Sequence, residues 1–191
     1  MGKKDSILAF ESSDDWENWL GKNHSDTEGI WIRIFKKNSG KKSITYAEAL
    51  DEALCYGWID GQKDKYDALS WLQKFTPRRP GSNWSKINTA HIERLINAGK
   101  METAGLIKVE EAKSDGRWEN AYHSQSTATI PEDFMKELEK NVKARRFFET
   151  LNKANLYAIK YRLQTAKRIE TRQKRIKLIL TMLSKGEQFH P

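Results

Sequence analysis

The residues best suited to chemistry lie between positions 57 and 88. Arg78 and Arg79 stand between two prolines, whose rings leave this loop little backbone freedom. A guanidinium held in this way can bind a carboxylate or a phosphate through two parallel hydrogen bonds. A helix is expected to begin just after the loop, and the first amide groups of a helix favour an anion. The stretch therefore predicts an anion-binding site, with these candidate residues: Trp58, Asp60, Arg78, Arg79, Ser82, Trp84, Ser85 and Asn88.

The same residues have a purely structural interpretation. Arg78 can pair with Asp60 or Asp64 across a hairpin and lock the loop. Ser82 or Ser85 can act as a helix N-cap. The three tryptophans of the stretch can be core residues, as most large aromatic side chains are. Both interpretations stay open at the level of the sequence.

The signals for catalysis and for a metal site are weaker. Cys55 is the single cysteine, so no internal disulfide forms, and a nucleophilic thiol would need a histidine close by. The four histidines are far apart and none has metal-ligand spacing: His24, His91, His123 and His190. No glycine-rich phosphate loop occurs, and no cofactor or metal is predicted. The pattern favours a binding protein over an enzyme; a small hydrolase or transferase would need Asp60, Cys55 or a histidine beside the arginines.

The positive charge is concentrated at the C-terminal end. Residues 131–191 hold 15 Lys and Arg against 7 Asp and Glu, whereas residues 1–130 hold 19 of each, so this third carries the whole net charge of +8. Helical periodicity over the last helix places Ile169, Ile176, Leu180 and Leu183 on one side. A basic surface is predicted beside them, with Lys167, Arg168, Arg172, Lys174 and Arg175. Such a surface suits nucleic acid, another polyanion or an acidic protein, and a merely solvated face is the plain alternative.

The elements that position these residues can be read from periodicity and caps. Alternation of Ile30, Ile32 and Ile34 with other residues predicts a strand over 30–36. Strands are also predicted over 58–64, which looks extended, and 70–76, and the two would form a hairpin beside the first. Thr45 and Glu48 have capping-box spacing, and Gly57 is a natural stop for the helix that they begin. These elements predict an α+β fold: a small antiparallel β-sheet packed by helices, followed by a basic C-terminal helical segment.

Several boundaries follow from single residues. A helix capped near Ser12 is expected to end near Gly21, and a helix over 103–113 is expected to be weakened by Gly105. Pro131 is expected at the first position of a helix. Because Ser124–Thr129 is small, polar and uncharged, it is the expected linker between a domain at 1–124 and one at 130–191.

The composition points to a cytoplasmic protein. Mean hydropathy is −0.80, no run of residues has the length and apolarity of a membrane span, and residues 1–10 lack the apolar core of a signal peptide. The single cysteine fits a reducing compartment.

The string from Glu48 to Gly61, EALDEALCYGWIDG, resembles the YdeI/OmpD-associated family, also called bacteriocin-protection proteins. Shorter matches extend the resemblance over nearly the whole chain: Phe75–Arg79, Trp84-Ser85 with Asn88, Gly99–Met101, Gly116–Trp118, Ala166-Lys167, Glu170–Arg172 and Arg175-Ile176. The resemblance implies association with an outer-membrane porin and resistance to bacteriocins or cationic peptides, and it brings no catalytic residues. Some members of the family are periplasmic. We therefore expect a binding protein linked to envelope stress. Its expected partner is an acidic protein or a small anionic ligand that contacts the Arg78–Arg79 loop.

Overall fold

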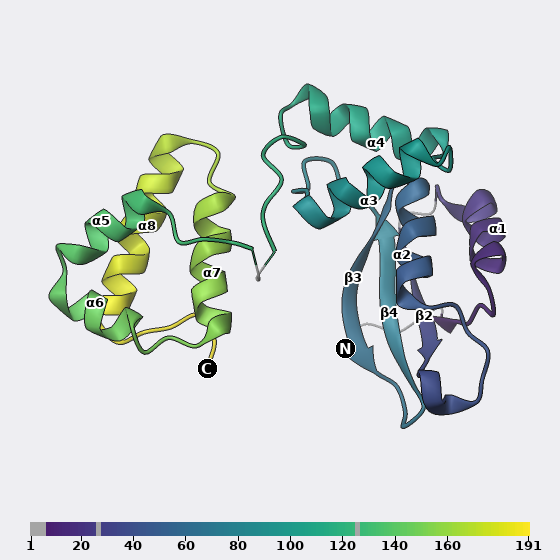
Figure 1. Cartoon of the computed structure of the whole chain (residues 1–191), viewed down its shortest axis with the longest axis horizontal. Helices are drawn as coiled ribbons and strands as arrows, with labels where there is room; N and C mark the ends of the chain where they lie inside the picture. Colours follow the sequence, from purple (N-terminus) through teal and green to yellow (C-terminus); the bar gives the residue numbers. More distant parts are fainter. Residues whose placement is uncertain (1–6, 26–27, 125–126) are drawn as a thin grey trace. The chain divides into compact units, whose positions relative to one another are not determined.

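The computed structural model describes residues 7–25, 28–124 and 127–191, which form two compact units (Figure 1). The sheet unit contains the residues up to Ser82 together with Asn88–Glu119. The helical unit contains Asn83–Ile87 and Asn120–Pro191. The predicted linker lies a few residues beyond the junction at Glu119, and its residues 125–126 lie outside the described residues.

The sheet unit is built on a four-stranded sheet. Its strands are β1 (Ile7–Leu8), β2 (Ile30–Phe35), β3 (Trp58–Lys65) and β4 (Ser70–Pro77), in the order β1-β2-β4-β3. The three predicted strands and the predicted hairpin are confirmed, and with them the α+β class. The difference is β1, which pairs parallel to β2 and makes the sheet mixed. Two residues are too few to produce an alternating pattern, which is why the sequence did not predict this strand.

Four helices accompany the sheet, and short-range hydrogen bonds explain where they start. They are α1 (Ser13–Asn23), α2 (Tyr46–Cys55), α3 (Lys86–Asn97, whose first two residues belong to the helical unit) and α4 (Thr103–Ser114). The predicted capping box is confirmed, since Thr45 Oγ1 accepts from the amide of Glu48 while the Glu48 carboxylate accepts from the Thr45 amide. The predicted end of α1 near Gly21 is wrong by two residues, because the glycine is helical and exposed and the helix continues to Asn23.

Aromatic residues fill the space between the sheet and α1. Trp16, Trp58 and Phe75 are fully buried, and the Trp16 ring lies 6.2 Å from Trp58 and 5.8 Å from Phe75. The indole nitrogens of both tryptophans donate to backbone carbonyls, Trp16 to Ala49 and Trp58 to His24. Because burial of an indole is favourable only when its N–H has a partner, these bonds fix both rings in the core.

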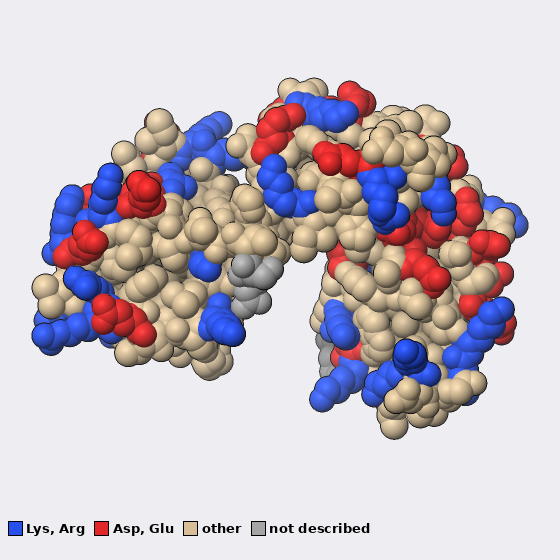
Figure 2. Space-filling view, viewed as in Figure 1, with Lys and Arg blue, Asp and Glu red and all other residues tan. Residues whose placement is uncertain are grey.

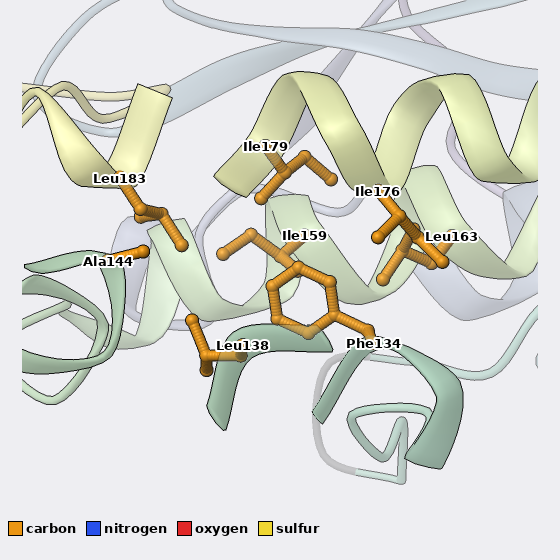
Figure 3. Close-up of a cluster of buried hydrophobic side chains, with 8 residues drawn as sticks. All are labelled: Phe134, Leu138, Ala144, Ile159, Leu163, Ile176, Ile179 and Leu183. Carbon is orange, nitrogen blue, oxygen red and sulfur yellow. The ribbon is translucent and has the colours of Figure 1, made fainter. Parts of the chain in front are cut away.

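The helical unit is a bundle of α5 (Glu132–Glu139), α6 (Val142–Phe148), α7 (Lys153–Gln164) and α8 (Ile169–Ser184). Figure 3 shows the apolar side chains that these helices turn toward one another: Phe134, Leu138, Ala144, Ile159, Leu163, Ile176, Ile179 and Leu183. The predicted apolar side of α8 is correct at Ile176 and Leu183 but wrong at Ile169, which is 70% exposed. Ile169 is the first residue of α8 and lies too far along the helix to reach the core. Pro131 is the N-cap of α5, one residue before its predicted position.

Acidic side chains gather over α1 and α2 (Figure 2). Burial raises the pKa of the Glu52 carboxyl, and the nearby charge of Glu17 raises it further. The folded state therefore prefers the protonated form, and the free energy of unfolding decreases as the pH rises from the unfolded pKa through the folded one.

Within the described ranges, no helix is both long and apolar enough to cross a bilayer.

The raised pKa of Glu52 gives a first prediction. The substitution Glu52→Gln will stabilise the protein by about 0.5 kcal/mol at pH 7 and will give no advantage near ~pH 3, where the wild-type carboxyl is already protonated. Thermal unfolding at the two pH values measures the difference. Glu93→Gln is the matched control, because Glu93 is an exposed carboxylate on α3 and its loss changes the net charge equally. A gain of equal size at both pH values would contradict the ionisation argument.

Candidate anion-binding site

The two arginines of the predicted loop lie in different environments. Arg79 is exposed, but Arg78 is only 6% exposed. The Arg78 amide donates to the Gly57 carbonyl at 3.0 Å, which extends the pairing of β4 with β3 beyond its last pair and holds Arg78 against the unit. The loop predicted as an anion-binding site therefore exposes Arg79 but not Arg78.

The remaining loop candidates have structural contacts. Trp58 belongs to the aromatic core, and the Asp60 carboxylate accepts a hydrogen bond from the Tyr46 hydroxyl at 2.8 Å. Burial and that carboxylate raise the pKa of Tyr46, so the hydroxyl keeps its proton and remains the donor. The Ser82 carbonyl accepts from Arg117 at 3.0 Å. Ser85 stands directly before α3 and forms a parallel bridge with Tyr122.

The eight candidates are also divided between the units. Six belong to the sheet unit, whereas Trp84, which is buried, and Ser85 belong to the helical unit. Asn88, on α3, is half-buried. No single compact body therefore holds the whole predicted set, and an anion site on this loop stays a prediction.

Two of the groups considered for catalysis, Cys55 and His91, are buried or hydrogen-bonded to a carboxylate. Cys55 is 1% exposed, and burial raises the pKa of its thiol to about 12, so it is protonated and unreactive at neutral pH. His91 Nδ1 lies 2.8 Å from Asp51, whose carboxylate also binds Arg94 at 2.6 and 2.7 Å; this network joins α2 to α3. Over the described ranges, no group of three His, Cys, Asp or Glu side chains is placed to hold a metal ion.

Two of the five predicted basic-surface residues brace the helical unit. Arg172 forms a two-bond ion pair with Asp133 at 2.6 and 2.7 Å and donates to the Leu163 carbonyl. That guanidinium holds the pKa of the Asp133 carboxyl below its usual range. Arg175 donates to the Arg162 carbonyl at 2.5 Å and to Thr165 Oγ1 at 3.1 Å. Both arginines thus satisfy carbonyls at the C-terminal end of α7 and offset its partial negative charge. Lys167, Arg168 and Lys174 are exposed.

A pocket of about 310 Å³ opens on the side of α7 beside Arg175. Tyr157, Tyr161 and Thr165 follow one another at intervals of four residues, so they form one ridge of the helix, and Arg162 lies one turn beyond the small Ala158. The C-terminal tail supplies one more lining residue, His190. The full lining is Tyr157, Ala158, Tyr161, Arg162, Thr165, Arg175 and His190.

The tail is held in place by Asn155, which is 0% exposed. The Asn155 amide oxygen accepts from the backbone amides of Phe189 and His190 at 2.9 and 3.0 Å, and its nitrogen donates to the His190 carbonyl at 3.1 Å. The Phe189 ring then lies 4.3 Å below the Arg162 guanidinium. Stacking of this kind uses the face of a guanidinium and leaves its N–H edge available to a ligand.

The electrostatics of this pocket, which we call the α7 pocket, favour an anion. Its lining contains two guanidiniums and no Asp or Glu. In the part of the chain that the structure describes, neither Arg162 nor Arg175 makes an ion pair, in contrast to Arg172 with Asp133. The Tyr157 and Tyr161 hydroxyls have no hydrogen-bond partner among the described residues, and burial raises the pKa of Tyr157, so it stays a neutral donor. Sequence reasoning missed this site, and the only available signal was the four-residue spacing of the tyrosines and of Ala158 and Arg162.

The fold and the pocket thus define a class of protein. It has an α+β unit joined to a helical unit, and the helical unit carries a basic, aromatic pocket. Residues 8–108 match the family described as "Domain of unknown function (DUF8412)". Because this match spans more than half of the chain, the chain belongs to that family, and its residues 127–186 match the family described as "Bacteriocin-protection, YdeI or OmpD-Associated". The predicted resemblance to the YdeI/OmpD-associated family is confirmed.

Most of the motifs that carry the resemblance lie within one match or the other, and Gly116–Trp118 lies in neither. The string at 48–61 lies within the first match, and the residues from Ala166 to Ile176 lie within the second. All of the α7 pocket except His190 lies within the second match. No curated protein and no solved structure shows a significant match to the chain.

Proposed function

We propose that this chain is a non-enzymatic binding protein that takes a small anion, a phosphate or a carboxylate, in the α7 pocket. The observation that carries the proposal is the pair of guanidiniums in one pocket without a carboxylate partner. Arg175 is half-buried, and a guanidinium in that position gains more from an anionic ligand than an exposed one such as Arg162, because solvent screens it less. The role that we propose with it is bacteriocin protection, which the description of the second family names, as part of an envelope-stress response.

The pocket replaces the Arg78–Arg79 loop as the leading site. The loop offers one exposed guanidinium, whereas the pocket offers two within one unit, with neutral hydroxyl donors beside them. A cytoplasmic location, favoured by the single cysteine, belongs to the same proposal.

Titration calorimetry with inorganic phosphate at low ionic strength tests this function. We expect saturable binding that weakens about tenfold or more in Arg162→Gln, since a hydrogen bond to a charged group contributes about 1.5–3 kcal/mol. Arg162→Lys keeps the charge and should retain part of the affinity. The control is Arg168→Gln, which removes the same charge from an exposed position outside the pocket. Equal loss in Arg162→Gln and Arg168→Gln would mean that only the general charge of the unit attracts phosphate, and the pocket assignment would be wrong.

A further inference from the structure

The aromatic residues of the α7 pocket indicate what the ligand contains besides its anionic group. Tyr157 is half-buried, and its one aromatic neighbour within the described residues is Tyr161, at 6.2 Å and an angle of 45°. Tyr161 also packs against Tyr122, edge to face at 4.9 Å. Within the described residues Tyr161 therefore has two aromatic neighbours, whereas Tyr157 has one.

The small side chain of Ala158 lies next to this ridge, and Arg162 follows it one turn later. A ring wall and a guanidinium edge thus line the same space, separated by a residue that leaves room between them. Tyrosine faces attract planar, electron-poor rings, and guanidinium edges attract phosphate oxygens.

The volume of the pocket indicates the size of ligand that it suits. At about 310 Å³ it lies at the small end of the range of ligand pockets, which runs from ~300 to ~1,000 Å³. That space suits one ring system with one phosphate better than it suits a dinucleotide.

We infer that the α7 pocket binds a nucleoside monophosphate, with the base on Tyr157 and the phosphate at Arg162 and Arg175. This inference rests on the proposed anion-binding function and adds the ligand class to it. Because every base has a face that can stack, the pocket is expected to accept purine and pyrimidine monophosphates alike.

Calorimetry with AMP, adenosine and inorganic phosphate tests the nucleotide inference separately from the proposed anion-binding function. We expect AMP to bind the full chain at least about tenfold more tightly than phosphate, and adenosine to bind more weakly than AMP. Tyr157→Leu should remove the advantage of AMP over phosphate, so that this variant binds the two about equally, whereas Tyr157→Phe should retain that advantage because it keeps the ring. Far-UV circular dichroism confirms that each variant is folded.

Each remaining outcome has a distinct meaning. Phosphate binding with no gain for AMP would overturn the nucleotide inference and leave the anion site standing. Absence of binding by both would overturn the proposed function itself. A 5′-phosphorylated oligonucleotide that binds as tightly as AMP would overturn the assignment to a free nucleotide and identify a strand end as the source of the same chemistry.

Discussion

Replacing Gly105 by alanine will destabilise the sheet unit by about 3 kcal/mol, although alanine is the better helix former. Gly105 is a buried residue in the first turn of α4, with no positive φ. A Cβ added there would lie 2.1 Å from the Cys55 carbonyl oxygen and 2.8 Å from the carbonyl carbon. Both atoms belong to the backbone at the end of α2, so no side-chain rotation can relieve the overlap.

The neighbouring contacts show that this approach is part of the design of the unit. The Glu102 amide donates to the same Cys55 carbonyl at 3.2 Å, which ties the start of α4 to the end of α2. Gly57, just beyond α2, has φ +74° and lies so close to α4 that a Cβ would stand 3.0 Å from the Ala104 carbonyl oxygen. Moving α4 outward to make room for one methyl group would therefore break a backbone hydrogen bond and open the packing around Cys55.

Gly21→Ala is the matched control. Gly21 is also helical, but it is exposed, and its added Cβ would meet only the Tyr56 hydroxyl at an ordinary 3.6 Å. That substitution should stabilise the unit by about 1 kcal/mol through helix propensity alone. Six of the seven tryptophans lie in the sheet unit, so urea unfolding followed by fluorescence reports on it. Stabilisation by both substitutions would show that α4 is not held against α2 by close backbone contact.

Gly105 also shows what the sequence can and cannot predict. Local signals were sufficient for the strands at 30–36 and 70–76 and for the capping box at Thr45, because alternation and capping involve residues close in the chain. A glycine inside a helical pattern indicates only weakness. Gly105 is required here because the end of α2, about fifty positions earlier in the chain, lies against it. No local pattern contains that contact.

The candidate site was misplaced for a related reason. Arginine type and proline spacing indicated Arg78 and Arg79, but burial of Arg78 depends on the β3–β4 pairing, which is a tertiary property. Arg172 and Arg175 looked equivalent on a helical wheel, yet one finds a carboxylate on α5 and the other reaches the end of α7. The α7 pocket needs the tail to fold back on Asn155, and that contact spans more than thirty residues.

Asn155→Leu will release that tail and lower the stability of the helical unit by about 3 kcal/mol. Leucine has a similar volume but can neither accept from the Phe189 and His190 amides nor donate to the His190 carbonyl. Those three backbone groups regain partners only by returning to water, which removes Phe189 from Arg162 and His190 from the pocket. Hydrogen exchange on the full chain should show faster exchange at 189–190 and in α7, with the sheet unit unchanged.

The three hydrogen bonds from Asn155 to the tail are here called the clamp, and two further variants test them separately from the neighbouring contacts. Asn155→Asp keeps the acceptor and loses the donors, so it should be intermediate in stability and tail exchange. Gln188→Ala removes only one long 3.4 Å contact to Asn155 from an exposed side chain, and it should change stability by less than about 0.5 kcal/mol. Because the released tail is one wall of the α7 pocket, Asn155→Leu should also weaken phosphate binding although Asn155 does not itself line the pocket. Wild-type tail exchange in Asn155→Leu would mean that the tail is held by Phe189 packing instead, and the clamp would have to be assigned to that ring.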